Sequence, residues 1–184
     1  DYVTVAHQDD QYHPDYAKTM LEMCAKYDDV SLFLTDYLPI KGGEIGKRDI
    51  NSKIRRLLRT PLKSARLANK IWWKKRVLCL GNSICCPAVT YHKARLGENI
   101  FTSEYKYNLD WDTFYKFACI PGRFVYADQP LTYYRVHDGA TSKEFIENHL
   151  RINDDIPMFR KFWPGWLVRL IMVFYKKAYD TYSK

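Results

Sequence analysis

Two neighbouring carboxylates, Asp9 and Asp10, stand where a β-branched segment at residues 1–6 runs into a polar loop. Ligands bind at the carboxyl ends of strands in α/β sheets. Carboxylate oxygens at such a corner can hold Mg²⁺ or Mn²⁺ while phosphate oxygens take the remaining metal positions. For two carboxylates alone, however, a solvated turn or a cap for the next helix is the simpler explanation.

A second acidic cluster, Leu109-Asp110-Trp111-Asp112, stands at the start of a predicted helix that Pro121-Gly122 ends. The helix dipole stabilises carboxylates there, so a capping role is the simpler explanation. A general base would occupy the same place, because the helix fixes its position while the carboxylate reaches an acceptor hydroxyl. The Trp111 ring could stack on a sugar face, although such a ring more often packs into the core.

A third group lies in a strand-like run at residues 131–137, where alternation places Tyr133, Arg135 and His137 on one face. The Arg side chain offers a planar fork to phosphate oxygens, and the His side chain offers a neutral metal ligand or a hydrogen-bond donor. The two side chains could therefore converge on one anionic group. An ordinary polar strand edge is the alternative for this segment.

These three groups, in this order, resemble the C-terminal two-thirds of the catalytic domain of a family 2 glycosyltransferase. That family consists of inverting enzymes of the GT-A fold that use nucleotide-sugar donors. The resemblance runs over nearly the whole chain to about Lys143. Residues 2–16 resemble the family's metal-binding corner, residues 108–114 its acidic acceptor motif, and residues 122–137 its closing strand pair. The order and spacing of the segments are more specific than any one of them.

The resemblance implies a role for each matching residue. Asp110 matches the catalytic base, which deprotonates the acceptor hydroxyl for attack opposite the leaving diphosphate. Asp9 matches the last acidic residue of the family's D-x-D motif, whose first acidic position is His7 in this chain. The expected ligands of a divalent cation, Mn²⁺ or Mg²⁺, are Asp9, Asp10 and His137. The expected donor-diphosphate or acceptor-binding residues are Arg135, Trp111 and Asp112.

The order of strand, helix, strand, helices, short strands and helices favours an α/β layered domain. The resemblance implies a GT-A-like, Rossmann-type mixed sheet with flanking helices that lacks its N-terminal nucleotide-binding half. Residues 1–143 would form this partial catalytic domain, and residues 144–184 a C-terminal helical extension. Such a chain alone is expected to bind donor poorly or not at all. Its truncated sheet would expose an edge that could pair with another copy in a homo-oligomer.

Turn and proline signals predict the elements between these groups. We expect a helix from Pro14, a buried strand at 30–36, a β-like segment at 77–86, a helical turn from Pro87 through Lys93, separate strands at 123–128 and 131–137, and C-terminal helices broken at Pro164-Gly165.

The net charge of +8 is concentrated in residues 53–76, which hold ten basic residues and no acid. The simplest interpretation is a solvated amphipathic surface of one or two helices, broken near Pro61. With Trp72-Trp73, the segment also suits an anionic membrane surface. Binding to nucleic acid has the same electrostatic footprint, but no helix-turn-helix, zinc-finger or RNP pattern supports it, so we expect no nucleic-acid partner.

Five cysteines form an odd set without paired C-x-x-C spacing, which favours a reducing compartment. The longest strongly apolar stretch, residues 166–175, is only ten residues long and contains Arg169, so it should not cross a bilayer. We therefore expect a cytoplasmic protein, peripheral on the inner membrane face.

The expected activity is transfer of a sugar to an acceptor hydroxyl in polysaccharide or glycoconjugate synthesis. The expected partners are a nucleotide-sugar donor and a glycan or lipid-linked acceptor. Two functions of other classes remain open, a non-catalytic sugar-binding or assembly module and a basic nucleic-acid-binding protein.

Overall fold

The structure is a computed structural model that describes residues 2–135 and 152–182, with side chains as far as Tyr175. His137 and the expected domain boundary between residues 143 and 144 lie outside the described residues.

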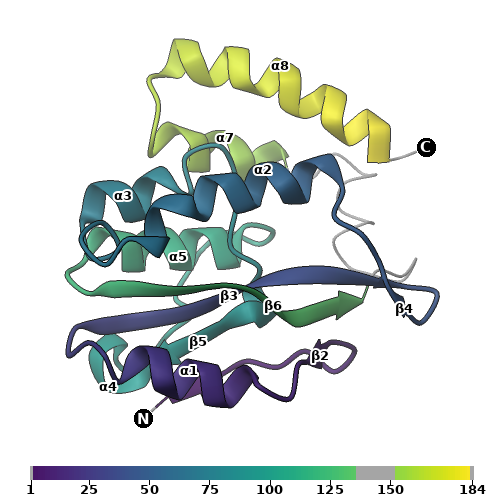
Figure 1. Cartoon of the computed structure of the whole chain (residues 1–184). Coiled ribbons are helices and arrows are strands. Elements are labelled where there is room, and N and C mark those ends of the chain that lie inside the picture. The colour runs from purple at the N-terminus through teal and green to yellow at the C-terminus, as the bar shows by residue number, and fades with distance from the viewer. Residues whose placement is uncertain (1, 136–151, 183–184) are drawn as a thin grey trace.

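Strands and helices succeed one another in an α/β order (Figure 1). The strands are β1 (Tyr2–Thr4), β2 (Gln11–Tyr12), β3 (Val30–Lys41), β4 (Glu44–Ile45), β5 (Val89–His92) and β6 (Arg123–Arg135). The helices are α1 (Tyr16–Cys24), α2 (Ile50–Arg59), α3 (Ile71–Arg76), α4 (Lys93–Leu96), α5 (Leu109–Cys119), α7 (Ile152–Arg160) and α8 (Gly165–Tyr182), with 3-10 turns η1 (Thr60–Lys63) and η2 (Cys86–Ala88).

The strands form one curled, mixed sheet in the order β1-β5-β3-β6-β2, with β4 paired to β3 outside this path. Only β3 and β6 are parallel among the pairs described, and the other neighbours are antiparallel. Helix α1 lies below the sheet, and α2, α3, α5, α7 and α8 lie above it (Figure 1). The chain is therefore a mixed α/β structure with flanking helices.

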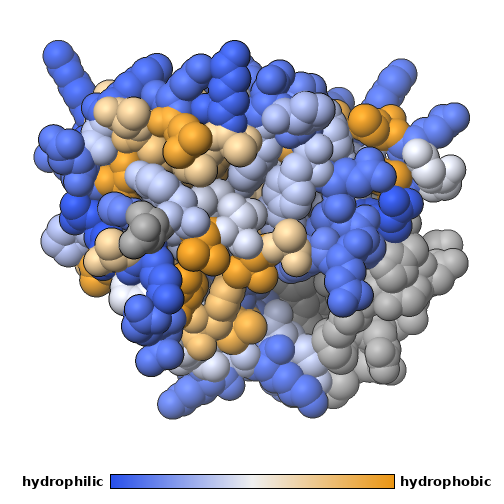
Figure 2. Space-filling model, turned by 90° about the horizontal axis from the view of Figure 1, so that it is seen from below, coloured by the Kyte–Doolittle hydropathy of each residue, from blue (hydrophilic) through white to orange (hydrophobic). Residues whose placement is uncertain are grey.

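Strand β1 is an edge of this sheet. Figure 2 shows the molecule from below, the side of α1, where apolar side chains gather in the centre and hydrophilic ones surround them. Val3 of β1 and Leu21 of α1 are exposed.

The central strand β3 is buried because both of its faces are covered. Leu32 and Leu34 belong to the larger core, which α5, α7 and α8 complete. Phe33, between them, points the other way and packs in a smaller core with Tyr16 and Met20 of α1. A strand covered on both faces has a continuous apolar sequence, which is why its start at Val30 was predicted correctly. Its predicted end at residue 36 was too early, because β3 continues to Lys41 beside β6 and β4.

The C-terminal helices pack on the same core as the sheet. Met158 and Phe159 of α7 and Val168 and Met172 of α8 are buried in one cluster with Trp111 of α5. No described helix is both long enough and apolar enough to cross a membrane.

The predicted strand at residues 77–86 was wrong, and so was the helical turn through Lys93. Gly81 takes a φ of 121°, and the Ser83 hydroxyl donates to the Val77 carbonyl, so the segment folds back on itself. The strand comes later, at β5, because residues 89–91 are β-branched and aromatic and fit between β1 and β3. Pro87 opens only the 3-10 turn η2.

The two strands predicted at 123–128 and 131–137 form one strand, β6, which is described from Arg123 to Arg135, and residues 136 and 137 lie outside the described residues. Its register with β3 shifts at Asp36, since Ala127 pairs with Thr35 and Pro130 with Asp36. Asp128 and Gln129 form an irregularity there, which is where a sheet interior tolerates proline. The predicted breaks near Pro61 and at Pro164-Gly165 are confirmed.

A buried ion pair joins this irregularity to α2. The guanidinium of Arg59 donates to the carboxylate of Asp36 at 2.6 Å, and both side chains are almost fully buried. Arg59 also lies over the rings of Tyr37 and Tyr126, at 4.9 and 5.4 Å from their centroids. Breaking a buried pair by removing one partner leaves an uncompensated charge.

We therefore expect Asp36→Ala to lower the free energy of unfolding by about 3–5 kcal/mol. Replacing both partners, in Asp36→Leu with Arg59→Leu, should recover part of this loss, because neither charge of the pair then remains buried, whereas Arg48 still loses its carboxylate partner. Urea denaturation at neutral pH measures both, with exposed Asp28→Ala as a control expected within about 0.5 kcal/mol of the parent. A loss below about 1 kcal/mol for Asp36→Ala would contradict this account.

Candidate functional site

The first predicted corner is built by Asp10 and Arg135, which are far apart in the sequence. The Asp10 carboxylate accepts a hydrogen bond from the backbone amide of Arg135 at 2.9 Å. The Arg135 side chain returns the contact, because its Nε donates to the backbone carbonyl of Asp9 at 3.1 Å. The structure thus brings together the metal-corner residues and the predicted phosphate-binding arginine.

Strand β2 holds this corner in place. Gln11 and Tyr12 follow the two aspartates and pair with Tyr133 and Thr132 of β6. The Tyr12 hydroxyl donates to the Pro87 carbonyl at 2.6 Å and so links the corner to the turn that begins at Cys86.

The Asp10 carboxylate is held in an unfavourable electrostatic position. Its side chain is only 5% exposed, and the Nδ1 atom of His7 lies 3.5 Å from it. Burial, helped by the charge of Asp9, raises the pKa of Asp10 above its ordinary value, although the Arg135 amide opposes this. A cation bound at the corner would relieve this penalty.

Asp110 lies in the first turn of α5, as predicted, and it is partly exposed. One carboxylate oxygen accepts from the Asn82 side-chain amide at 2.7 Å, and the other accepts from the Trp111 backbone amide at 2.7 Å. These bonds and the positive end of the helix fix the carboxylate in one orientation.

The loop at Cys86 lies between the two acidic groups. Burial raises the pKa of the Cys86 thiol to about 12, and the charges of Asp110 and Asp10 both add to the shift. Both carboxylates are therefore close enough to this one thiol to act on it through space. The charges of Asp10 and Asp110 thus both act on this loop.

The structure places Trp111 and Asp112 away from this group. The Trp111 side chain is 0% exposed, and its indole donates to the Leu78 carbonyl at 3.1 Å, so its ring face is not offered to a ligand. The packing alternative therefore describes Trp111, and the sugar-stacking alternative does not.

Asp112 is likewise a structural residue. Its buried carboxylate is paired with Lys161, which follows α7, and lies 3.0 Å from Lys116 of α5. Burial alone would raise its pKa, but the hydrogen bond from Lys161 and those from other neighbours lower the pKa of Asp112 overall. Its expected contact with donor or acceptor is corrected to a link between α5 and α7.

Asp9 and Asp10 are the two expected cation ligands that the structure describes. Among the described residues, no group of three or more His, Cys, Asp or Glu side chains is arranged to hold a metal ion. Mg²⁺ needs only one or two carboxylates when phosphate oxygens and water complete its coordination. Asp9 and Asp10 therefore suit an ion shared with a diphosphate, and do not suit one held by the protein alone.

Two residues of the site carried no clear sequence signal. From the sequence, Asn82 was predicted only as a turn residue after Gly81, and Cys86 only as part of a strand. Asn82 acts through its hydrogen bond to Asp110, and the Cys86 thiol senses the charges of Asp110 and Asp10, which lie tens of residues away along the chain. Neither spacing nor periodicity records such contacts.

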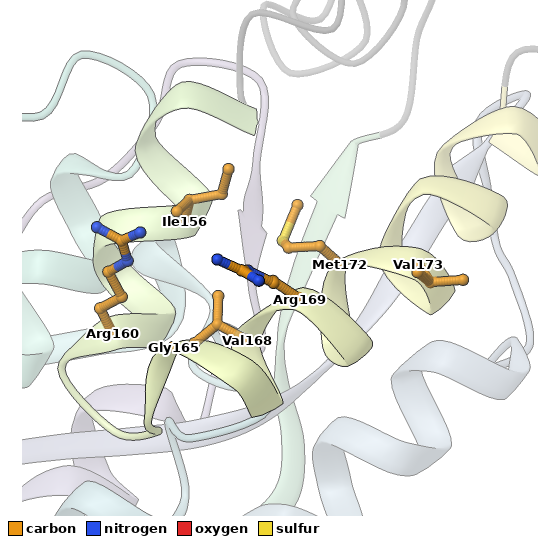
Figure 3. Close-up of a pocket in the computed structure, with 7 residues that line it drawn as sticks. All are labelled: Ile156, Arg160, Gly165, Val168, Arg169, Met172 and Val173. Atoms are coloured by element: carbon orange, nitrogen blue, oxygen red, sulfur yellow. The ribbon is translucent and has the colours of Figure 1, made fainter.

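A separate hollow of about 370 Å³ lies between α7 and α8 (Figure 3). Its walls are largely apolar, with Arg160 and Arg169 contributed by the two facing helices (Figure 3). None of the predicted site residues lines it, so it does not bear on their chemistry.

Comparison with known proteins does not decide the function. No protein-family model and no curated protein matches this chain.

The position of Cys86 can be tested by its reactivity. Since the thiolate is the nucleophile, a pKa of about 12 should make alkylation of native Cys86 by iodoacetamide at pH 8 at least about 100-fold slower than in urea. Removing a nearby negative charge lowers a thiol pKa, so Asp110→Asn should accelerate the reaction. Peptide mapping by mass spectrometry follows the rate, and exposed Glu104→Gln is the charge-matched control. Equal rates for Asp110→Asn and the parent would place Asp110 elsewhere.

Proposed function

We propose that this chain is the acceptor-side part of an inverting glycosyltransferase of family 2, with a GT-A-like, Rossmann-type sheet. The observation that carries the proposal is that both acidic groups are bonded to one short segment, since Asn82 donates to Asp110, and Tyr12, two residues after Asp10, donates to the Pro87 carbonyl. The two carboxylates would have different roles. Asp10 would help to bind the cation of the donor diphosphate, and Asp110 would accept the proton of the acceptor hydroxyl. The mixed sheet with helices on both sides is compatible with this fold.

In the proposed reaction, Asp110 is the general base. Its orientation is fixed by the bonds from Asn82 and the Trp111 amide, and its partial exposure leaves it open to an acceptor. The carboxylate would take the proton of the acceptor hydroxyl as the oxygen attacks the anomeric carbon. Because attack comes from the face opposite the leaving diphosphate, the anomeric configuration inverts.

Negative charge accumulates on the departing nucleoside diphosphate. Arg135 lies at the corner where that charge would arrive, and its guanidinium can form a fork to phosphate oxygens. Asp9 and Asp10 would hold a Mn²⁺ or Mg²⁺ ion, which when bound neutralises part of the diphosphate charge. His137 remains a proposed third ligand outside the described residues.

The role of Asp110 as general base can be tested by assaying the longest natural form of the chain with a panel of nucleotide sugars, with and without Mn²⁺. Asp110→Asn should lower nucleoside diphosphate release by roughly 10²–10⁴-fold, the usual contribution of a general base, with little change in urea stability. Asp112→Asn should have the opposite effect. It should lower the free energy of unfolding while nucleoside diphosphate release by the folded protein stays close to that of the parent. Failure of the parent to release nucleoside diphosphate from any donor would contradict the proposal.

The cation corner makes a separate prediction. Asp10→Asn should weaken Mn²⁺ binding in the presence of a nucleoside diphosphate by at least about 10-fold, as read by the electron paramagnetic resonance of free Mn²⁺. Protons compete with the ion, and the pKa of Asp10 is raised. The affinity of the parent should therefore begin to fall at a higher pH than that of an ordinary aspartate site. Unchanged affinity in Asp10→Asn would place the ion elsewhere.

The alternatives give different outcomes in the same experiments. A non-catalytic sugar-binding or assembly module would bind glycan equally well after Asp110→Asn. A nucleic-acid-binding protein would show steeply salt-dependent binding to duplex DNA or RNA and no response to nucleotide sugars.

A further inference from the structure

Helix α2 presents its apolar face to the outside. Ser52 and Arg59 are its buried residues, whereas Ile50, Ile54 and Leu57 are 75%, 49% and 71% exposed. The three apolar residues follow one another at i, i+4 and i+7, so they form a single stripe along the helix. We call Ile50, Ile54 and Leu57 the α2 stripe.

A hollow of about 740 Å³ adjoins this stripe, which contributes Leu57 to its wall. Its lining comes from β3, from the chain between β4 and α2, from α2 itself and from η1. Five of the lining residues are cations, Lys47, Arg48, Lys53, Arg56 and Lys63, and none of the lining residues is acidic. We call this hollow the basic cleft.

Two carboxylates next to the basic cleft hold part of this charge in place. Arg56 donates two hydrogen bonds to Asp128, at 2.9 and 3.0 Å, and Lys63 is paired with the same carboxylate. Arg48 is paired with Asp36, whose other oxygen is taken by Arg59. The five lining cations outnumber the two carboxylates, so the cleft keeps an excess of positive charge.

One polar atom in the wall lacks a partner. The Nε of Arg48 is buried and has no hydrogen-bond partner among the described residues. A buried donor without an acceptor carries a desolvation penalty, which an anion in the cleft could relieve. Guanidinium and ammonium groups around an apolar wall suit a phosphate group that is attached to a hydrocarbon.

We propose that the basic cleft binds the phosphate of an anionic phospholipid, with the α2 stripe inserted into the membrane surface beside it. The charge of the cleft and the exposed apolar stripe on the same helix together match a bilayer interface, where headgroups lie next to hydrocarbon. None of Asp10, Asn82, Cys86, Asp110 and Arg135 lines the cleft, so the inference does not rest on the transferase activity.

Flotation with vesicles of phosphatidylcholine and phosphatidylglycerol in equal parts tests the membrane arm. Lys47→Gln with Lys53→Gln should weaken vesicle binding roughly 25-fold, taking about fivefold for each well-placed lysine. Ile50→Ser with Ile54→Ser should also weaken it, by roughly 10-fold or more, because both exposed side chains lose their contact with hydrocarbon. Thermal unfolding of each variant checks that these surface substitutions leave the fold intact.

Soluble pyrophosphate, measured by isothermal titration calorimetry, tests the phosphate arm. The lysine pair should weaken pyrophosphate binding, and the isoleucine pair should leave it unchanged. Lys18→Gln with Lys26→Gln is the charge-matched control, since both lysines are exposed and lie on or next to α1, on the other side of the sheet. This control should change neither kind of binding.

Four results would overturn the inference. If the α1 control lost as much vesicle binding as the lysine pair, the effect would come from net charge and not from the basic cleft. Pyrophosphate binding without vesicle binding would exclude the lipid as the source of the phosphate. Binding of duplex RNA without vesicle binding, weakened by the lysine pair, would assign the cleft to nucleic acid. A dimer that the isoleucine pair dissociates would assign the α2 stripe to a second copy of the chain.

Discussion

The buried pair of Asp36 and Arg59 is the contact on which the upper layer of the molecule depends. Its carboxylate belongs to the central strand and its guanidinium to α2, so the pair sets where that helix lies on the sheet. Arg59 also donates to the Ser83 carbonyl, next to the residue that holds Asp110. Because a buried charge must keep its partners, α2 is tied to the sheet by polar residues and its apolar stripe remains outside.

Both carboxylates of the candidate site, Asp10 and Asp110, are oriented by hydrogen bonds from amide groups. Asp10 is anchored by one backbone amide and Asp110 by an amide side chain and a backbone amide. Each anchor fixes the direction in which its carboxylate points. The anchors from Arg135 and Asn82 come from segments far along the chain, so both carboxylates are oriented only when the sheet and the turn at Asn82 are formed.

The sequence revealed those parts of the structure that depend on local patterns. Continuous apolar residues identified β3, and the Pro121-Gly122 pair located the end of α5. It failed for β5, because that strand is selected by its neighbours β1 and β3, whose partners are distant along the chain. The acidic groups were found from residue type and spacing, whereas Asn82 and the outward face of α2 depend on tertiary contacts.

The neighbours of Asp110 explain why the C-terminal helices matter to the site. Successive residues of a helix differ by about 100° in direction, so Asp110 can remain accessible while Trp111 and Asp112 point inward. The ring of Trp111 packs against Phe159 of α7 at 5.1 Å between centroids, and Asp112 is paired with Lys161 just beyond that helix. These two contacts hold the first turn of α5, so α7 helps to position Asp110 through its two neighbours in the sequence.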